Sequence, residues 1–124
     1  MKKIGIFIDS RKKSGGAYQE LLYTIKNIKK NMGWCNDSKN KLYNQEINVS
    51  KNIKHEKLFR KDYKYDYLLV IEYNTKKIKP NKGSAIFIHL TKNFKTTAGC
   101  IALSQKDFLI MIKLVNKKSK IKIS

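Results

Sequence analysis

His89 and Cys100 are the two side chains in this sequence whose types and spacing could perform acyl transfer. A cysteine thiolate attacks carbonyl carbon, and a neighbouring imidazole can take the thiol proton and later return it to a leaving amine. Gly99 lets the backbone approach a substrate carbonyl, so the N–H groups of Gly99 and Cys100 could hold the oxyanion of a tetrahedral intermediate. The pattern predicts a cysteine nucleophile with a histidine general base.

The same residue types also have a structural interpretation. A lone cysteine is more often a small core residue than a nucleophile, and a lone histidine is more often a packed donor. The spacing of His89 and Cys100 by itself leaves both interpretations open. We expect Cys35, beside Trp34, to be structural. No Cys-x-x-Cys or His-x-x-x-His spacing occurs, so a metal site is not expected.

Both candidate residues are expected at the ends of regular elements. Residues 84–90 predict a strand, because Ala-Ile-Phe-Ile is apolar and β-branched and follows a glycine, and this strand ends near His89. Ser104 followed three residues later by Asp107 predicts the start of a helix. The apolar stripe of that helix is Phe108, Met111, Ile112 and Val115. Cys100 is therefore expected just ahead of a helix N-terminus, where free N–H groups and the helix dipole would favour the thiolate.

The rest of the chain predicts further strands and helices. Residues 3–8 predict a short buried strand, followed by a glycine-bearing loop and a helix over 17–29. The apolar face of that helix would be Leu21, Leu22, Ile25 and Ile28. Turn-forming residues over 32–50 predict irregular chain, and residues 55–60 a helical turn. Residues 65–73 and 120–123 predict strands.

Composition limits the classes of partner. The chain has 124 residues, enough for one core, and a formal net charge of +19. Clustered cations bind polyanions, but all except two of the 28 basic residues are lysine, whereas nucleic-acid recognition relies on the planar guanidinium. We expect a solvated basic surface rather than a nucleic-acid interface. No apolar run reaches the length of a membrane-spanning helix, and no export signal is visible.

Several short motifs follow one another in an order that resembles the L,D-transpeptidase (YkuD-type) family. The resemblance extends over about residues 29–123 and is closest to the branch with Thr-Ala-Gly-Cys around the nucleophile. The motifs are Gly33-Trp34-Cys35-Asn36-Asp37, Tyr43-Asn44, Glu56 to Asp62, Tyr65-Asp66, Tyr73-Asn74, Gly83 to Leu90 and Thr97 to Leu103.

The resemblance implies an α+β, mainly β fold, with an L,D-transpeptidase-like β core and flanking helices. It also implies that Cys100 attacks the amide between the third and fourth residues of a donor stem peptide of peptidoglycan, and that an acceptor amine resolves the thioester. His89 would be the general base and acid, and the Gly99 backbone the oxyanion site. Ser84, Thr97 and Arg60 would contact the substrate. No metal or organic cofactor is implied, and family analogy implies the periplasm or cell envelope.

The sequence departs from the family pattern in two ways. The broader family places His two residues before the nucleophile and Arg two residues after it, where this chain has Ala98 and Ala102. Residues 1–28 lack the family's N-terminal motifs and resemble the first strand, loop and helix of a GT-B glycosyltransferase. We expect an N-terminal strand-loop-helix over 1–28 and an incomplete catalytic region over 29–124, with the strand at Ile4 to Ile8 partly replacing a missing one. The alternative hypothesis is a truncated, inactive domain that acts as a cationic binding module for peptidoglycan or another polyanion.

Overall fold

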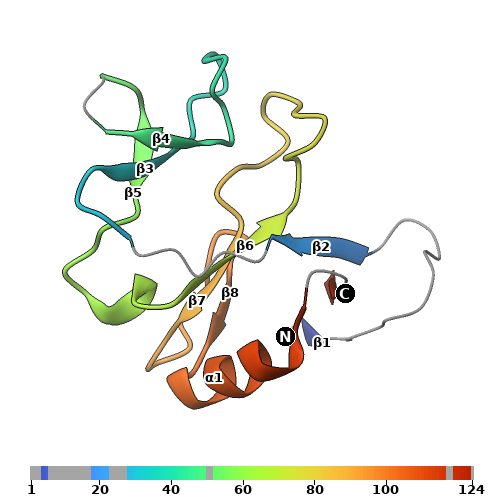
Figure 1. Cartoon of the computed structure of the whole chain (residues 1–124). Coiled ribbons are helices and arrows are strands. Elements are labelled where there is room, and N and C mark those ends of the chain that lie inside the picture. The colour runs from blue at the N-terminus through green and yellow to red at the C-terminus, as the bar shows by residue number, and fades with distance from the viewer. Residues whose placement is uncertain (1–3, 6–17, 23–27, 50–51, 117–118, 124) are drawn as a thin grey trace.

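The computed structural model describes residues 4–5, 18–22, 28–49, 52–116 and 119–123 (Figure 1). These residues form one mixed sheet, one antiparallel sheet, one α-helix and a short 3-10 helix, η1 (Tyr63–Tyr65). The larger sheet has six strands in the order β1 (Ile4–Gly5), β9 (Lys120–Ile123), β2 (Tyr18–Leu22), β6 (Leu68–Glu72), β7 (Phe87–Leu90) and β8 (Ile101–Leu103). The smaller sheet has three, in the order β4 (Glu46–Asn48), β3 (Met32–Cys35) and β5 (His55–Lys57). The fold is α+β and mainly β, as the sequence predicted.

Strands β7 and β8 run parallel, whereas the other described pairings are antiparallel. Parallel neighbours need a crossover connection, which residues 91–100 provide. His89 lies opposite Ala102 in this pairing, and Ile88 lies opposite Ile101. The crossover therefore returns the chain so that the residue before β8, Cys100, comes back beside the strand that carries His89.

The larger sheet has an apolar cluster on each face. On one face, Leu69, Ile71, Ile88 and Leu90 pack with residues of the helix α1 (Gln105–Leu114). On the other face lies a second cluster, and it contains Trp34, Leu58, Tyr65, Leu68, Ala85 and Phe87, with Cys100 packed against it. Alternating side chains of a strand point to opposite faces, so β6 and β7 each contribute to both clusters.

Helix α1 begins where the sequence predicted. The Ser104 hydroxyl accepts a hydrogen bond from the Asp107 backbone N–H at 3.1 Å, which satisfies one of the free donors of the first turn. Phe108, Met111 and Val115 are buried against the sheet, and the amphipathic stripe is confirmed. No helix in the described ranges is long and apolar enough to cross a membrane.

The predicted helix over residues 17–29 is wrong where the structure describes it. Tyr18–Leu22 is strand β2, which pairs with β6 on one side and with β9 on the other. Because β2 lies between β6 and β9, its backbone makes hydrogen bonds on both sides, and this pairing outweighs the local helical pattern. Residue 17 and residues 23–27 lie outside the described residues.

The N-terminal strand expected at residues 3–8 is described only at Ile4–Gly5, as β1. It pairs antiparallel with β9, Ile4 opposite Ile123 and Gly5 opposite Lys122. The described part of this strand is therefore paired, as we expected if it replaces a strand of the core. Residues 3 and 6–8 and the Gly15-Gly16 loop lie outside the described residues.

The region from Met32 to Arg60 is more regular than the sequence predicted. Residues 32–50 were expected to be irregular but contain β3 and β4, and the expected helical turn at residues 55–60 is strand β5. These strands are three or four residues long, so a period-2 pattern is hardly visible in the sequence. Backbone pairing of β3 with β4 and β5 stabilises these strands, which local propensity alone does not predict. The strands expected at 65–73, 84–90 and 120–123 are confirmed as β6, β7 and β9.

Gly33 lies in the middle of β3, where the neighbouring strands leave no room for a side chain. A Cβ atom at this position would come within 2.6 Å of Val49 Cγ1 and 2.9 Å of His55 Cδ2. We expect Gly33→Ala to lower the free energy of unfolding by about 1–3 kcal/mol, because the small sheet must move apart. Urea denaturation measures this change. The exposed neighbour Asn31 gives a matched control: Asn31→Ala should change stability by less than about 0.5 kcal/mol, and equal effects of the two changes would contradict the packing argument.

Candidate active site

Cys100 lies in the turn that precedes β8 and is half-buried. Its Sγ donates a hydrogen bond to the Ala85 carbonyl oxygen at 3.3 Å. Burial raises the pKa of the Cys100 thiol, the backbone N–H of Phe87 opposes this, and the Glu56 carboxylate adds to the increase. Because the sulfur donates to a carbonyl and its pKa is raised, the resting group is a thiol.

The predicted helix N-terminus beside Cys100 is wrong. Strand β8 lies between Cys100 and α1, which begins only at Gln105. The stabilisation of a helix dipole falls off within the first turn, so α1 is not positioned to favour the thiolate. The turn itself is polar, since the Thr97 hydroxyl donates a hydrogen bond to the Cys100 carbonyl oxygen.

His89 is a buried polar residue of β7 with one defined partner. Its Nδ1 lies 2.9 Å from the Leu90 carbonyl oxygen, and the side chain is 8% exposed. A carbonyl oxygen only accepts, so Nδ1 carries a proton, and in the neutral form of the ring the lone pair is on Nε2. A backbone carbonyl thus orients the ring in the way that a carboxylate does in many catalytic triads.

Cys100 and His89 are brought to the same face of two neighbouring strands. In the β7–β8 register, continuing one residue back from Ile101 places Cys100 beside Phe87, and side chains two residues apart share a face. Among the described residues, no hydrogen bond joins Sγ to the imidazole, because Sγ bonds Ala85 and Nδ1 bonds Leu90. Transfer of the thiol proton to the imidazole therefore requires Sγ to give up its hydrogen bond with the Ala85 carbonyl oxygen.

Tyr65 and Glu56 belong to the same cluster, although the sequence assigned them no role. The Tyr65 ring lies 5.5 Å from the His89 ring and 6.0 Å from the Phe87 ring, between ring centroids. Its hydroxyl donates to Glu56 on β5. Burial first, and then this carboxylate, raise the pKa of Tyr65. The only sequence signal for the pair was that both residues stand inside motifs of the family resemblance.

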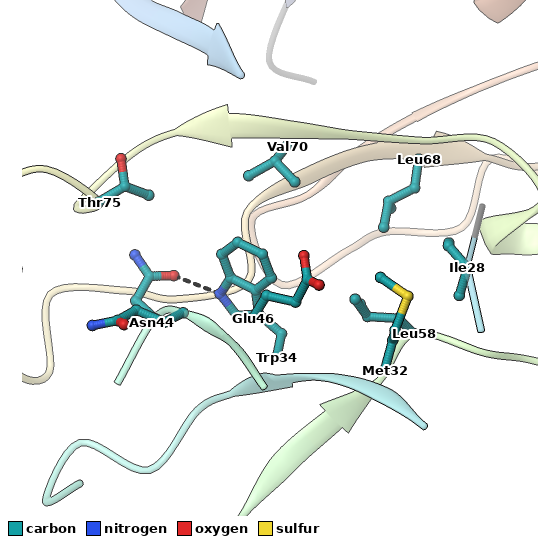
Figure 2. A pocket seen from close by; sticks show the side chains of 10 residues that line it. Ile28, Met32, Trp34, Asn44, Glu46, Leu58, Leu68, Val70 and Thr75 are labelled. Carbon is teal, nitrogen blue, oxygen red and sulfur yellow. Dashed lines mark hydrogen bonds between the residues drawn. The ribbon is translucent and has the colours of Figure 1, made fainter. Parts of the chain in front are cut away.

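Asn44 holds Ala85 in place, and the Ala85 carbonyl oxygen accepts the hydrogen bond from the Cys100 thiol. Its Oδ1 accepts hydrogen bonds from Trp34 Nε1 at 2.8 Å (Figure 2) and from the Ala85 N–H at 3.1 Å. Its Nδ2 donates to the carbonyl oxygens of Tyr73 and Asn74 at 3.0 and 2.7 Å. Ala85 has a φ of 55°, which a non-glycine residue rarely adopts, and these bonds hold it there.

Gly99 has a φ of 121°, a backbone conformation that side-chain-bearing residues rarely adopt. A Cβ atom there would also approach Ile86 Cδ1 to 3.2 Å. The turn before Cys100 therefore depends on glycine. Ser84, also expected to contact substrate, is half-buried and directly precedes Ala85.

Arg60 lies at the edge of this cluster. Its guanidinium is 5.1 Å from the Tyr65 ring centroid and makes two hydrogen bonds to Asp62, from Nε at 2.8 Å and from Nη2 at 2.6 Å. Ala102, where the broader family has arginine, lies opposite His89. Among the residues that the structure places, no group of three Cys, His, Asp or Glu side chains is arranged to hold a metal ion.

The Asp62 carboxylate provides a test of the Arg60 geometry. The hydrogen bond from Arg60 is the main cause that lowers the pKa of Asp62 from 3.8 to about 2. A depressed folded-state pKa contributes stability above the unfolded value, and this contribution is lost as the pH falls through about 2. NMR titration of the Asp62 carboxyl should give a midpoint near 2, and Arg60→Ala should return it to about 3.9. The neighbouring change Lys61→Ala should leave the midpoint in place, and a similar shift in both variants would contradict the pairing.

The thiol of Cys100 should react slowly at neutral pH. Iodoacetamide alkylates thiolate, so the rate at Cys100 should keep rising as the pH passes the ordinary range of a cysteine. Site-resolved mass spectrometry separates Cys100 from Cys35, which is fully buried and provides an internal reference. Glu56→Gln keeps a hydrogen-bond acceptor for Tyr65 but removes the charge, so the profile should move to lower pH. Glu46→Gln makes the same change on β4, and a shift of equal size there would argue against a specific effect of Glu56.

Comparison with known proteins gives one family. Residues 4–123 match the L,D-transpeptidase catalytic domain of the YkuD type. The match includes β1 and β2 as well as the region of the motifs. Comparisons with curated proteins and with solved structures gave no match. Because the matched residues are nearly the whole chain and include Cys100 and His89, the chain belongs to the L,D-transpeptidase (YkuD-type) catalytic domain family.

Proposed function

We propose that the chain is a cysteine acyltransferase that acts on peptidoglycan stem peptides by L,D-transpeptidation. Family membership supports the class of acyltransferase. The observation that supports the proposal is that Cys100, directly before β8, packs with the apolar cluster on the face of β7 that carries His89, and that the Leu90 carbonyl oxygen accepts from Nδ1 of His89. The cell envelope is the compartment where this substrate occurs.

In the proposed first step, Sγ of Cys100 attacks the carbonyl carbon of the amide between the third and fourth residues of the donor stem peptide. His89 Nε2 takes the thiol proton as the C–S bond forms. The N–H groups of Gly99 and Cys100 stabilise the resulting oxyanion. Collapse of the tetrahedral intermediate breaks the C–N bond, and His89 returns the proton to the leaving amine of the fourth residue. The product is a thioester on Cys100.

In the second step, the amine of an acceptor stem peptide attacks the thioester carbonyl. His89 takes a proton from this amine and gives it to the departing sulfur, so the new amide and the free thiol form together. Neither step changes an oxidation state. The raised pKa of the Cys100 thiol means that the general base is needed for attack and not merely helpful.

Substrate binding is proposed for Ser84, Thr97 and Arg60, which flank the pair. Thr97 and Ser84 lie on the two segments that bracket Cys100 and the Ala85 carbonyl. Among the described residues, Arg60 is the arginine available for a substrate carboxylate, since residue 102 is alanine, and its guanidinium would be shared with Asp62.

Acylation by a carbapenem, a β-lactam that a cysteine acyltransferase opens to a thioester, tests the proposal. The intact mass should rise by the mass of one carbapenem, and Cys100→Ala should abolish this adduct. His89→Ala should slow adduct formation by about 10²–10⁴-fold, since it removes the general base. Time-resolved mass spectrometry measures both.

Cys35→Ala is the matched control, because it removes the other free thiol. It should retain the adduct at the wild-type rate. An adduct that persists in folded Cys100→Ala, or its absence from folded wild-type protein, would contradict the proposal. In the second case the inactive binding module becomes the better description of the chain.

A further inference from the structure

Tyr65 is a buried aromatic residue that contacts both His89 and a carboxylate. The centroids of the Tyr65 and His89 rings are 5.5 Å apart, and the two ring planes are tilted by 60°. The Tyr65 hydroxyl donates a hydrogen bond to Oε1 of Glu56, on strand β5. Tyr65 and His89 are each 8% exposed. Because water is largely excluded from both rings, the electrostatic interaction between them is stronger than it would be at the surface.

The contacts of Tyr65 hold its ring in one place. The ring packs edge-on against Phe87, with the ring centroids 6.0 Å apart and the planes at 87°. The hydrogen bond to Glu56 fixes the hydroxyl end of the side chain. The His89 ring is held separately at Nδ1, which lies 2.9 Å from the Leu90 carbonyl oxygen. A tyrosine that is fixed by packing and by a hydrogen bond can orient the imidazole that lies against it.

The Glu56 carboxylate has two opposite effects on the candidate pair. Burial is the main cause that raises the pKa of Cys100, and the Glu56 charge adds to it, so the carboxylate disfavours the thiolate. The same negative charge favours a positive charge on a neighbouring group. In both steps of the proposed reaction, His89 carries the transferred proton as an imidazolium, which is a cation in a buried site. The carboxylate therefore opposes the resting thiolate but assists the charged state of the base.

We propose that Tyr65 and Glu56 are positioning residues of the acyl transfer, which orient the His89 ring and stabilise its imidazolium form. The Tyr65 ring lies within the distance at which an aromatic ring attracts a cation, and the hydrogen bond to a carboxylate makes that ring richer in electrons. The Arg60 guanidinium, 5.1 Å from the same ring centroid, opposes this effect, but Asp62 neutralises its charge. The inference rests on the proposed acyl transfer, because the imidazolium forms in that reaction.

Two reactions of the same sulfur atom test this role. Alkylation of Cys100 by iodoacetamide needs only the thiolate, whereas acylation by a carbapenem also needs a proton delivered to the nitrogen that leaves when the β-lactam ring opens. Glu56→Gln removes the charge but keeps a hydrogen-bond acceptor for Tyr65. At neutral pH we expect it to speed alkylation by about twofold or more and to slow acylation by about fivefold. Time-resolved mass spectrometry measures both rates.

A second variant and a matched control separate the hydrogen bond from general packing. Tyr65→Phe keeps the ring but breaks the bond to Glu56, and it should slow acylation by about two- to fivefold. Tyr63→Phe, on the same 3-10 helix, removes a hydroxyl that accepts from the Lys92 N–H at 3.2 Å, and it should change neither rate by more than about twofold. The limiting alkylation rate at high pH reports access to Sγ, and it should be the same in Glu56→Gln as in the wild type.

The outcomes distinguish the positioning role from the proposed function. If wild-type protein forms no carbapenem adduct, the acyl transfer is contradicted and this inference falls with it. If the wild type is acylated but folded Glu56→Gln reacts at the wild-type rate or faster, or if Tyr63→Phe slows acylation as much as Tyr65→Phe, only the positioning role is overturned. A higher limiting alkylation rate in Glu56→Gln would also overturn it, because the change would then be one of access. If circular dichroism shows that Glu56→Gln is unfolded, Tyr65→Phe decides the test.

Discussion

Strand β7 is buried on both faces, and the rest of the described structure is arranged around that burial. All four of its residues are buried, with Ile88 and Leu90 in the cluster against α1 and Phe87 and His89 on the opposite face. A short strand with two buried faces needs a layer on each side, which α1 and the small sheet supply. His89 is tolerated among apolar neighbours because Nδ1 bonds the Leu90 carbonyl, and that same bond leaves Nε2 available as a base.

The geometry at Cys100 follows from backbone groups that side chains hold in place. Asn44 lies far from Ala85 in the sequence, yet its amide bonds the Ala85 N–H, while the Ala85 carbonyl accepts the thiol. The chain therefore keeps its cysteine protonated on a fixed acceptor, and burial favours the same state. The Tyr65 ring lies beside the His89 ring and its hydroxyl donates to the Glu56 carboxylate, so both residues contribute to the surroundings of the candidate pair.

The face that carries His89 also borders a pocket of about 310 Å³, lined by residues that include Trp34, Leu58, Leu68 and Val70, and its chemistry differs from that around His89. The Tyr65 ring lies beside His89 and carries the Arg60 guanidinium over it, whereas aliphatic side chains make up most of the pocket lining. Trp34 of β3, Leu58 directly after β5, and Tyr65 pack with Leu68 and Phe87 of the large sheet on this face.

Local patterns in the sequence were sufficient for elements whose signals are local. The Ser104 cap, the stripe of α1, the apolar runs of β6 and β7 and the motifs around His89 and Cys100 could all be recognised, because capping, periodicity and order of residues lie within a few positions of one another. Strand β2 in place of a helix, the three short strands of the small sheet, and the contacts of Asn44, Glu56 and Tyr65 could not. They depend on backbone pairing and hydrogen bonds between residues distant in the chain. The thiol state of Cys100 also depends on the fold, because burial raises its pKa and because β8 separates it from the start of α1. The sequence by itself determined which residues could react, and only the tertiary structure decided what surrounds them, because desolvation and long-range pairing exist only once the chain has folded.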